Sequence, residues 1–331
     1  MGGSANYSSD VYDRVIRTKI ISGHVFDYTK KVEQTGIYEA HESLNVMPNG
    51  KPTTREARDS AAMPNVTPII IGMDATGSMG DNPAILQQKG KEIFGTIIRH
   101  GMVEDPQIAI AAYGDANCDL VPLQFGQFES DNKIDDELDN LYLERCGGGN
   151  GGETSTLLAY YAAYHTSIDS WEKRQRKGYL FIVGDERALD LTPSQVRKFV
   201  GDRQPQGNLD AVSVFRAAAE HWNIYVLIPM YDSRGRSTQA ECQKSYKQYS
   251  QLVGAQHVMK IHDASLAPAM IVALLATAEQ TSTDLLTDLV VAGFTGKEVA
   301  AVHEAMGSSV VPADNANDSV TTVERMPDLG L

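Results

Sequence analysis

Cysteine is scarce in this chain and is never closely spaced. The 331 residues include three cysteines, Cys118, Cys146 and Cys242, and none belongs to a Cys-x-x-Cys pair. This spacing excludes a zinc ribbon and argues against a disulfide framework. An odd number of thiols suits a reducing compartment.

Long apolar runs and an excess of basic charge are missing as well. No stretch approaches the ~18–20 apolar residues of a transmembrane helix, and the first residues lack the pattern of a signal peptide. Lys plus Arg number 29 against 43 Asp plus Glu, so the formal net charge is −14. A field of that sign repels phosphate backbones. We therefore expect no nucleic-acid partner, no membrane contact and a cytoplasmic location, whereas a cation remains a natural ligand.

Composition divides the chain into three parts. Residues 1–66 are polar and balance eight acidic against eight basic side chains, with few large apolar residues, so this N-terminal extension cannot form its own core. It is either a leader without fixed structure or an arm that orders against the main domain or a neighbouring subunit. Short strands are expected within residues 11–28. Residues 281–331 carry eight acids and two bases, and here we expect helices over 285–291 and 297–306 and then a polar tail.

The central part, residues 67–280, alternates short apolar runs with helical patterns. This alternation predicts an α/β fold with a doubly wound, Rossmann-like, mostly parallel sheet of six strands. The second and third strands are close enough for a hairpin, which makes one edge strand antiparallel. The expected strands are 67–73, 107–113, 120–125, 178–183, 223–229 and 257–261, and the expected helices are 83–100, 131–143, 154–166, 193–200, 209–222, 239–252 and 265–279.

Oxygen-bearing side chains follow the first of these strands directly. The segment Asp-Ala-Thr-Gly-Ser-Met places Asp74, Thr76 and Ser78 within five residues. Ligands of open α/β sheets bind at the carboxyl ends of the strands, where this segment lies. Carboxylate and hydroxyl oxygens that converge in this way suit Mg²⁺, Mn²⁺ or Ca²⁺.

This segment resembles the metal-ion-dependent adhesion site (MIDAS) of von Willebrand factor A (vWA) domains, in which Asp-x-Ser/Thr-x-Ser follows an apolar strand. The resemblance covers about residues 67–280 and implies a doubly wound sheet with one antiparallel edge strand. It implies two further metal-site loops. One supplies a threonine from a glycine-rich loop before a helix, matched by Thr154, with Glu153 and Thr156 as alternates. The other supplies an aspartate at the end of the fourth strand, matched by Asp185.

In that family the hydroxyl groups bind the metal, the first-loop aspartate acts through water or orients them, and one coordination position stays open for a partner's carboxylate. The second loop here departs from the family pattern, because a long glycine-rich run precedes Glu153 and Thr154. A Glu153 carboxylate on the metal would compete with the partner's carboxylate.

The resemblance implies a non-enzymatic module that binds another protein through a divalent cation, Mg²⁺ in the first place. The partner would offer an acidic residue or a C-terminal carboxylate, and the N-terminal arm suggests self-assembly or a larger complex. Two settings fit: an adaptor for a ring ATPase of the MoxR type in a bacterial cell, or a structural protein associated with a virion, as in a phage.

Two other interpretations compete. The segment that begins at Asp74 also resembles the phosphorylated motif of P-type ATPases and of haloacid dehalogenase-like phosphatases. Asp74 would then be a nucleophile and Asp185 would hold Mg²⁺. Against this, Thr76 stands where soluble members carry a second aspartate. In the other interpretation, Asp74 and Ser78 merely cap the following helix and no metal binds.

Overall fold

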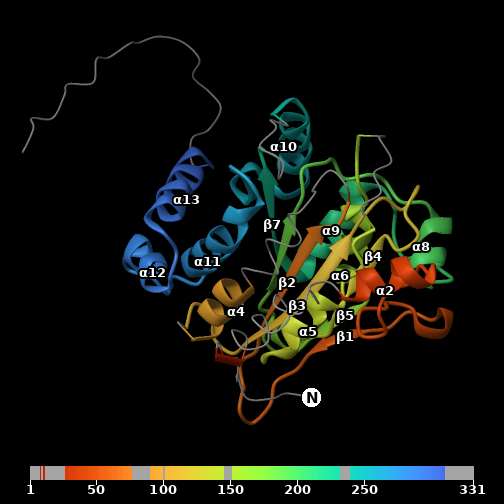
Figure 1. The fold of residues 1–331 in the computed structure, drawn as a ribbon, viewed down its shortest axis with the longest axis horizontal. Coiled ribbons are helices and arrows are strands. Elements are labelled where there is room, and N and C mark those ends of the chain that lie inside the picture. The colour runs from red at the N-terminus through yellow and green to blue at the C-terminus, as the bar shows by residue number, and fades with distance from the viewer. Residues whose placement is uncertain are drawn as a thin grey trace, which may run out of the picture.

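A six-stranded sheet with the strand order β4-β3-β2-β6-β7-β8 forms the centre of the protein (Figure 1). The structure is a computed structural model that describes residues 8, 10–11, 27–76, 90–99, 101–144, 151–231 and 239–309. All neighbouring strands are parallel except β3 and β4. The predicted Rossmann-like α/β fold is thus confirmed. The strands are β2 (Thr67–Asp74), β3 (Pro106–Tyr113), β4 (Leu123–Phe125), β6 (Gly178–Val183), β7 (Trp222–Pro229) and β8 (Val258–Ile261).

Strand β2 lies in the middle of the sheet and is buried along its whole length. Its side chains alternate between the two faces, as a strand requires. Ile69 and Ile71 enter one hydrophobic core and Ile70 enters the other. A side chain at Gly72 would lie 2.2 Å from Leu158 Cδ2, so glycine allows the helix that carries Leu158 to pack closely on β2.

Helices cover both faces of the sheet (Figure 1). Each layer packs its apolar side chains on one core. One layer contains α4 (Gly90–Arg99), α5 (Lys133–Asp139), α11 (Ala267–Ala278), α12 (Leu285–Val291) and α13 (Gly296–Ser309), and the other contains α6 (Ser155–Tyr164), α8 (Pro193–Phe199), α9 (Ala211–His221) and α10 (Gln239–Val253). Among the described residues, none of the helices has the length and apolar character needed to span a membrane.

Several boundaries differ from the sequence prediction. The helix expected over 131–143 ends at Asp139, and the third strand begins at Leu123 rather than Leu120. Residues 27 and 28, expected in a strand, begin helix α2 (Asp27–Thr35), whereas most of 11–26 lies outside the described residues. Among the short elements that were not predicted are two strands and one helix, because three to six residues carry too little periodicity. They are β1 (Arg55–Ala57), β5 (Thr166–Ile168) and α7 (Asp169–Arg174).

The described part of the N-terminal extension, residues 27–66, packs against the α/β domain. Strand β1 pairs in parallel with β5, more than 100 residues further along the chain. Leu44 and Met63 are fully buried, each in one of the two cores. The Thr29 hydroxyl donates a hydrogen bond to the Leu141 carbonyl at 2.9 Å. Residues 27–66 therefore form an arm ordered against the main domain, and not a leader without fixed structure.

Ion pairs connect residues 58 and 59 of the N-terminal extension to α7. Arg58 contacts Asp169 at 2.9 Å and also pairs with Glu172. Asp59 pairs with Arg174 at 2.8 Å, and this partner lowers the pKa of Asp59 to about 2. Because several charges share the contacts, the network holds the geometry better than isolated surface pairs would.

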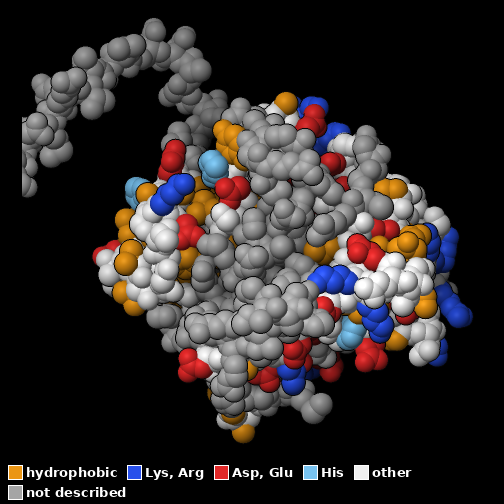
Figure 2. Space-filling model, in the orientation of Figure 1, with side chains coloured by type: hydrophobic (Ala, Val, Ile, Leu, Met, Phe, Trp, Pro, Cys, Tyr) orange, Lys and Arg blue, Asp and Glu red, His pale blue; other side chains and the backbone are white. Residues whose placement is uncertain are grey.

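The C-terminal helices α12 and α13 confirm the expected helical pair. Leu289 and Val302 anchor them in the core beside α11. Hydrophobic side chains also reach the surface over this pair, at the left of Figure 2. Those on α12 are Leu286, Val290 and Val291.

Replacing Leu44 tests whether the N-terminal segment belongs to the core. We expect Leu44→Ala to lower the free energy of unfolding by about 2–5 kcal/mol, because a buried side chain is truncated and leaves a cavity. Urea denaturation measures the change. Ile37→Ala is the control, since Ile37 is 58% exposed and should change stability by less than about 0.5 kcal/mol. Equal effects of the two variants would show that the segment adds nothing to the core.

A buried carboxyl group on α5 makes stability depend on pH. The Gln127 N–H donates to Glu137 Oε1 at 2.9 Å, but Oε2 is buried with no hydrogen-bond partner. Burial is the main reason that the pKa of Glu137 rises from 4.5 to about 8. Between these values the unfolded chain has lost the proton while the folded chain keeps it. Stability therefore falls as the pH rises through this window.

Substituting Glu137→Gln should remove this dependence. The quantity to follow is the unfolding free energy of the unmodified chain minus that of Glu137→Gln. We expect this difference to fall by at least about 1 kcal/mol when the pH rises from 5 to 7.5. Denaturation at several pH values measures it. Glu33→Gln on the exposed side of α2 should leave the pH profile unchanged. Parallel profiles for the unmodified chain and Glu137→Gln would contradict the raised pKa.

Candidate functional site

Asp74 is the last residue of β2 and is fully buried. Its Oδ1 accepts hydrogen bonds from the Thr76 N–H at 2.8 Å and from the Thr76 hydroxyl at 2.6 Å. Its Oδ2 is buried with no hydrogen-bond partner. The turn after β2 therefore fixes the carboxylate and leaves one oxygen unsatisfied. Ser78, the third residue of the predicted motif, lies outside the described residues.

Thr154 immediately precedes α6 and joins two loops. Its hydroxyl donates to the Gly114 carbonyl and accepts from the Ala116 N–H at 2.8 Å, and its own N–H donates to the Gly114 carbonyl at 3.0 Å. Gly114 and Ala116 belong to the loop after β3. These bonds hold the loop before α6 against the carboxyl end of β3.

The loop after β6 approaches the same place. The Glu153 N–H donates to the Arg187 carbonyl at 2.8 Å, and Glu153 forms a short parallel bridge with Ala188. A side chain at Gly184 would lie 3.3 Å from the Asp74 Cβ and 2.2 Å from the Tyr113 hydroxyl. Glycine at 184 thus lets the end of β6, followed directly by Asp185, come close to the end of β2.

Asp185 and α10 are also joined. The Ser245 hydroxyl donates to the Asp185 backbone carbonyl at 2.8 Å. The Tyr249 and Ser155 hydroxyls share a hydrogen bond of 2.8 Å between α10 and α6. The candidate site therefore draws on four loops. The loops after β3 and β6 are hydrogen-bonded to the loop before α6, and after β2 the Ala75 N–H donates to the Tyr113 carbonyl at the end of β3 at 2.9 Å.

Carboxyl groups crowd together in this buried place and oppose one another's ionisation. Burial raises the pKa of Asp74 well above its ordinary value, and the charge of Asp185 raises it further. Burial, and then Asp74 and Glu186, raise the pKa of Glu153 to about 10. Burial also raises the pKa of Asp119 to about 6. A positive charge at this place would offset the repulsion.

The structure thus brings Asp74, Thr76, Thr154 and Asp185 to one end of the sheet, together with the alternate Glu153. Glu153 Oε2 is buried without a hydrogen-bond partner. Thr156, the other alternate, is fully buried within α6, and its hydroxyl likewise has no partner.

Two acidic residues of this region were not predicted. Asp115 and Asp119 follow β3, where the sequence indicated only a hairpin turn. The Asp115 N–H donates to Asp119 Oδ2 at 2.7 Å, and the Asn117 N–H donates to Asp115 Oδ1 at 2.9 Å. The signal was present, because Asp115 stands just past the carboxyl end of a buried strand, as Asp74 and Asp185 do.

The donor set consists of hard oxygens, which Mg²⁺, Mn²⁺ and Ca²⁺ accept. In the described part of the chain, no three His, Cys, Asp or Glu side chains are grouped so that they could hold a metal ion by themselves. A cation here would therefore depend on the threonine hydroxyls in addition to the carboxylates. Asp74 Oδ2 and Glu153 Oε2, both buried and without a hydrogen-bond partner, are carboxyl oxygens that such a cation would satisfy.

Comparison with known proteins gives distant structural likenesses. No protein-family model and no curated protein matches the chain. Among solved structures, it is similar to the pilus adhesin SpaC from Lactobacillus rhamnosus GG in its open conformation, with 8% identity and a TM-score of 0.44. It is also similar to proximal thread matrix protein 1 from the mussel byssus, with 10% identity and a TM-score of 0.40. The matches cover 69% and 65% of this chain but 31% of the adhesin and 46% of the mussel protein.

Removing the Thr154 hydroxyl should loosen the loops around the site. We expect Thr154→Val to lower the free energy of unfolding by about 1–3 kcal/mol, because the buried Ala116 N–H loses its acceptor. Thr154→Ser keeps the hydroxyl and should cost less. Urea denaturation of both variants measures the difference, and a valine variant as stable as the serine variant would show that these hydrogen bonds do not hold the loop.

Proposed function

We propose that this chain is a vWA-type module that binds another protein through a divalent cation. The convergence of Asp74, Thr76, Thr154 and Asp185 at the carboxyl end of the sheet is the observation that carries the proposal. These residues come from three separate segments, and each was singled out from the sequence for the same site. Buried carboxylates that raise one another's pKa are frequent at functional sites.

The chain's own residues would divide the task of holding the cation. Asp74 and Asp185 supply negative charge, and the hydroxyl oxygens of Thr76 and Thr154 supply neutral ligands. Ser78 completes the motif in sequence. When bound, the cation provides a positive charge with a free coordination position that accepts a partner's carboxylate.

The acidic surroundings make the cation essential for an acidic partner. In addition to burial, the charges of Asp185 and Glu186 raise the pKa of Asp74, and those of Asp74, Glu186 and Asp115 raise the pKa of Glu153. Without the cation, a partner carboxylate would meet carboxyl groups and no positive charge at this place. We therefore expect binding of the partner to depend on the metal.

Calorimetry tests the metal site directly. We expect Mg²⁺ and Mn²⁺ to bind, and Asp74→Asn to weaken binding at least tenfold, because the substitution removes a charge from the centre of the site. Asp136→Asn is the matched control, since Asp136 is exposed on α5 and outside the site. Equal affinities for the unmodified chain and Asp74→Asn would refute the site assignment.

A pull-down with and without EDTA tests the partner and separates this function from the phosphatase alternative. We expect one partner to be retained with Mg²⁺ by the unmodified chain and by Asp136→Asn, and lost with EDTA or with Asp74→Asn. The identity of this partner distinguishes a ring-ATPase adaptor from a virion component. Hydrolysis of p-nitrophenyl phosphate with Mg²⁺ that disappears in Asp74→Asn would instead favour the phosphatase.

A further inference from the structure

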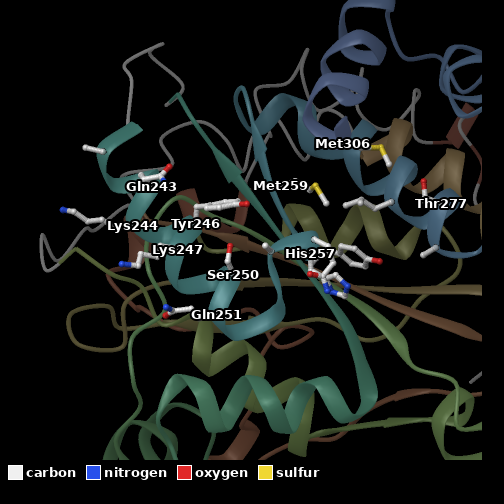
Figure 3. A pocket seen from close by; sticks show the side chains of 16 residues that line it. Gln243, Lys244, Tyr246, Lys247, Ser250, Gln251, His257, Met259, Thr277 and Met306 are labelled. Atoms are coloured by element: carbon white, nitrogen blue, oxygen red, sulfur yellow. The ribbon is translucent and has the colours of Figure 1, made fainter. Parts of the chain in front are cut away.

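A concave region lies between α10, β8 and the C-terminal helices (Figure 3). It is a cavity of about 1030 Å³ that opens to solvent, and its lining comes from β7, β8, α10, α11, α13 and the short helix η3 (Ala255–His257). None of Asp74, Thr76, Glu153, Thr154 and Asp185 lines it. Its volume is at the upper end of the range for small-molecule sites.

The walls of this cavity are mainly apolar. Tyr225 and Met259 come from β7 and β8, and Leu274 and Met306 come from α11 and α13. Tyr246 forms part of the α10 side, where the Lys260 ammonium lies 4.2 Å from the centre of its ring. The His257 ring stacks on Tyr225, and its Nδ1 is hydrogen-bonded to the Ile224 carbonyl. These contacts make the imidazole a structural part of the cavity wall.

The charge of the cavity is opposite to that of the chain. Among the residues that the structure describes, no Asp or Glu lines it, although the chain contains 43 of them, whereas Lys244 and Lys247 do. Lys244 pairs with Glu241 at 2.7 Å. Lys247 has no ion-pair partner in the ranges that the structure describes, so its ammonium is available to an anion at the mouth of the cavity.

Two more polar groups stand one turn further along the same helix. Ser250 and Gln251 also line the cavity, at positions i+3 and i+4 from Lys247 on α10 (Figure 3). The Ser250 hydroxyl is buried with no hydrogen-bond partner. A buried hydroxyl without a partner is costly, and an acceptor atom of a ligand would satisfy it.

We propose that this cavity binds an amphipathic anion, a small molecule with one acidic head group on an aliphatic body. The head group contacts the Lys247 ammonium and accepts hydrogen bonds from Ser250 and Gln251. The aliphatic body packs on Tyr225, Met259, Leu274 and Met306. A peptide fits this lining less well, because its backbone N–H and C=O groups would face an apolar wall with few partners.

Decanoate is the probe for this site, and its displacement of a bound anilinonaphthalene sulfonate dye gives the readout. We expect decanoate to compete with the dye and decanol, which lacks the charge, to bind at least tenfold more weakly. Lys247→Glu should weaken decanoate binding at least tenfold. Ser250→Ala should weaken it severalfold, and Met306→Glu, which places an acid against the aliphatic body, should abolish it.

Lys51→Glu is the matched control, since Lys51 is an exposed lysine outside the cavity and its reversal changes net charge equally. Its affinity for decanoate should equal that of the unmodified chain. Equal losses in Lys247→Glu and Lys51→Glu would show a nonspecific charge effect and overturn the proposal. Failure of decanoate to bind would also overturn it, as would tight binding of an acidic amphipathic peptide without competition from decanoate. Circular dichroism of each variant verifies that the fold is kept.

Discussion

The burial of β2 between two parallel neighbours is the constraint on which the rest of the structure depends. β2 pairs with β3 along eight residues and with β6 along five. Parallel strands end at the same edge of a sheet, so the loops after β2, β3 and β6 have to meet there. The position of Asp74 against Asp185 and the β3 loop follows from this pairing, and Gly184 is the residue that permits the close approach.

This convergence places mutually repelling carboxyl groups where water is scarce. Burial and neighbouring acids raise the pKa values of Asp74, Glu153 and Asp119, so the ionisation of these groups opposes folding. The two cores and the ion pairs around Arg58 and Asp59 stabilise the fold against that cost. A destabilising cluster kept within a stable scaffold is typical of a functional site.

The candidate site and the cavity beside β8 differ in the sign of their charge. The strand ends gather acids, whereas the described residues that line the cavity include lysines and no acid. The formal charge of −14 is therefore distributed unevenly, and the two regions would select ligands of opposite charge. Helix α10 borders both, because Ser245 bonds to the Asp185 carbonyl while Lys247 and Ser250 line the cavity.

The six strands, the single antiparallel pair and the place of Asp74 and Asp185 at strand ends followed from the sequence, because buried parallel strands are continuous apolar runs whose ends are visible. Only the tertiary structure decided which loop groups meet. Thr154 finds its partners Gly114 and Ala116 about 40 residues away, β1 pairs with the distant β5, and Leu44 enters the core of the domain that the sequence predicts to begin at residue 67. Such contacts depend on long-range packing, which local periodicity does not encode.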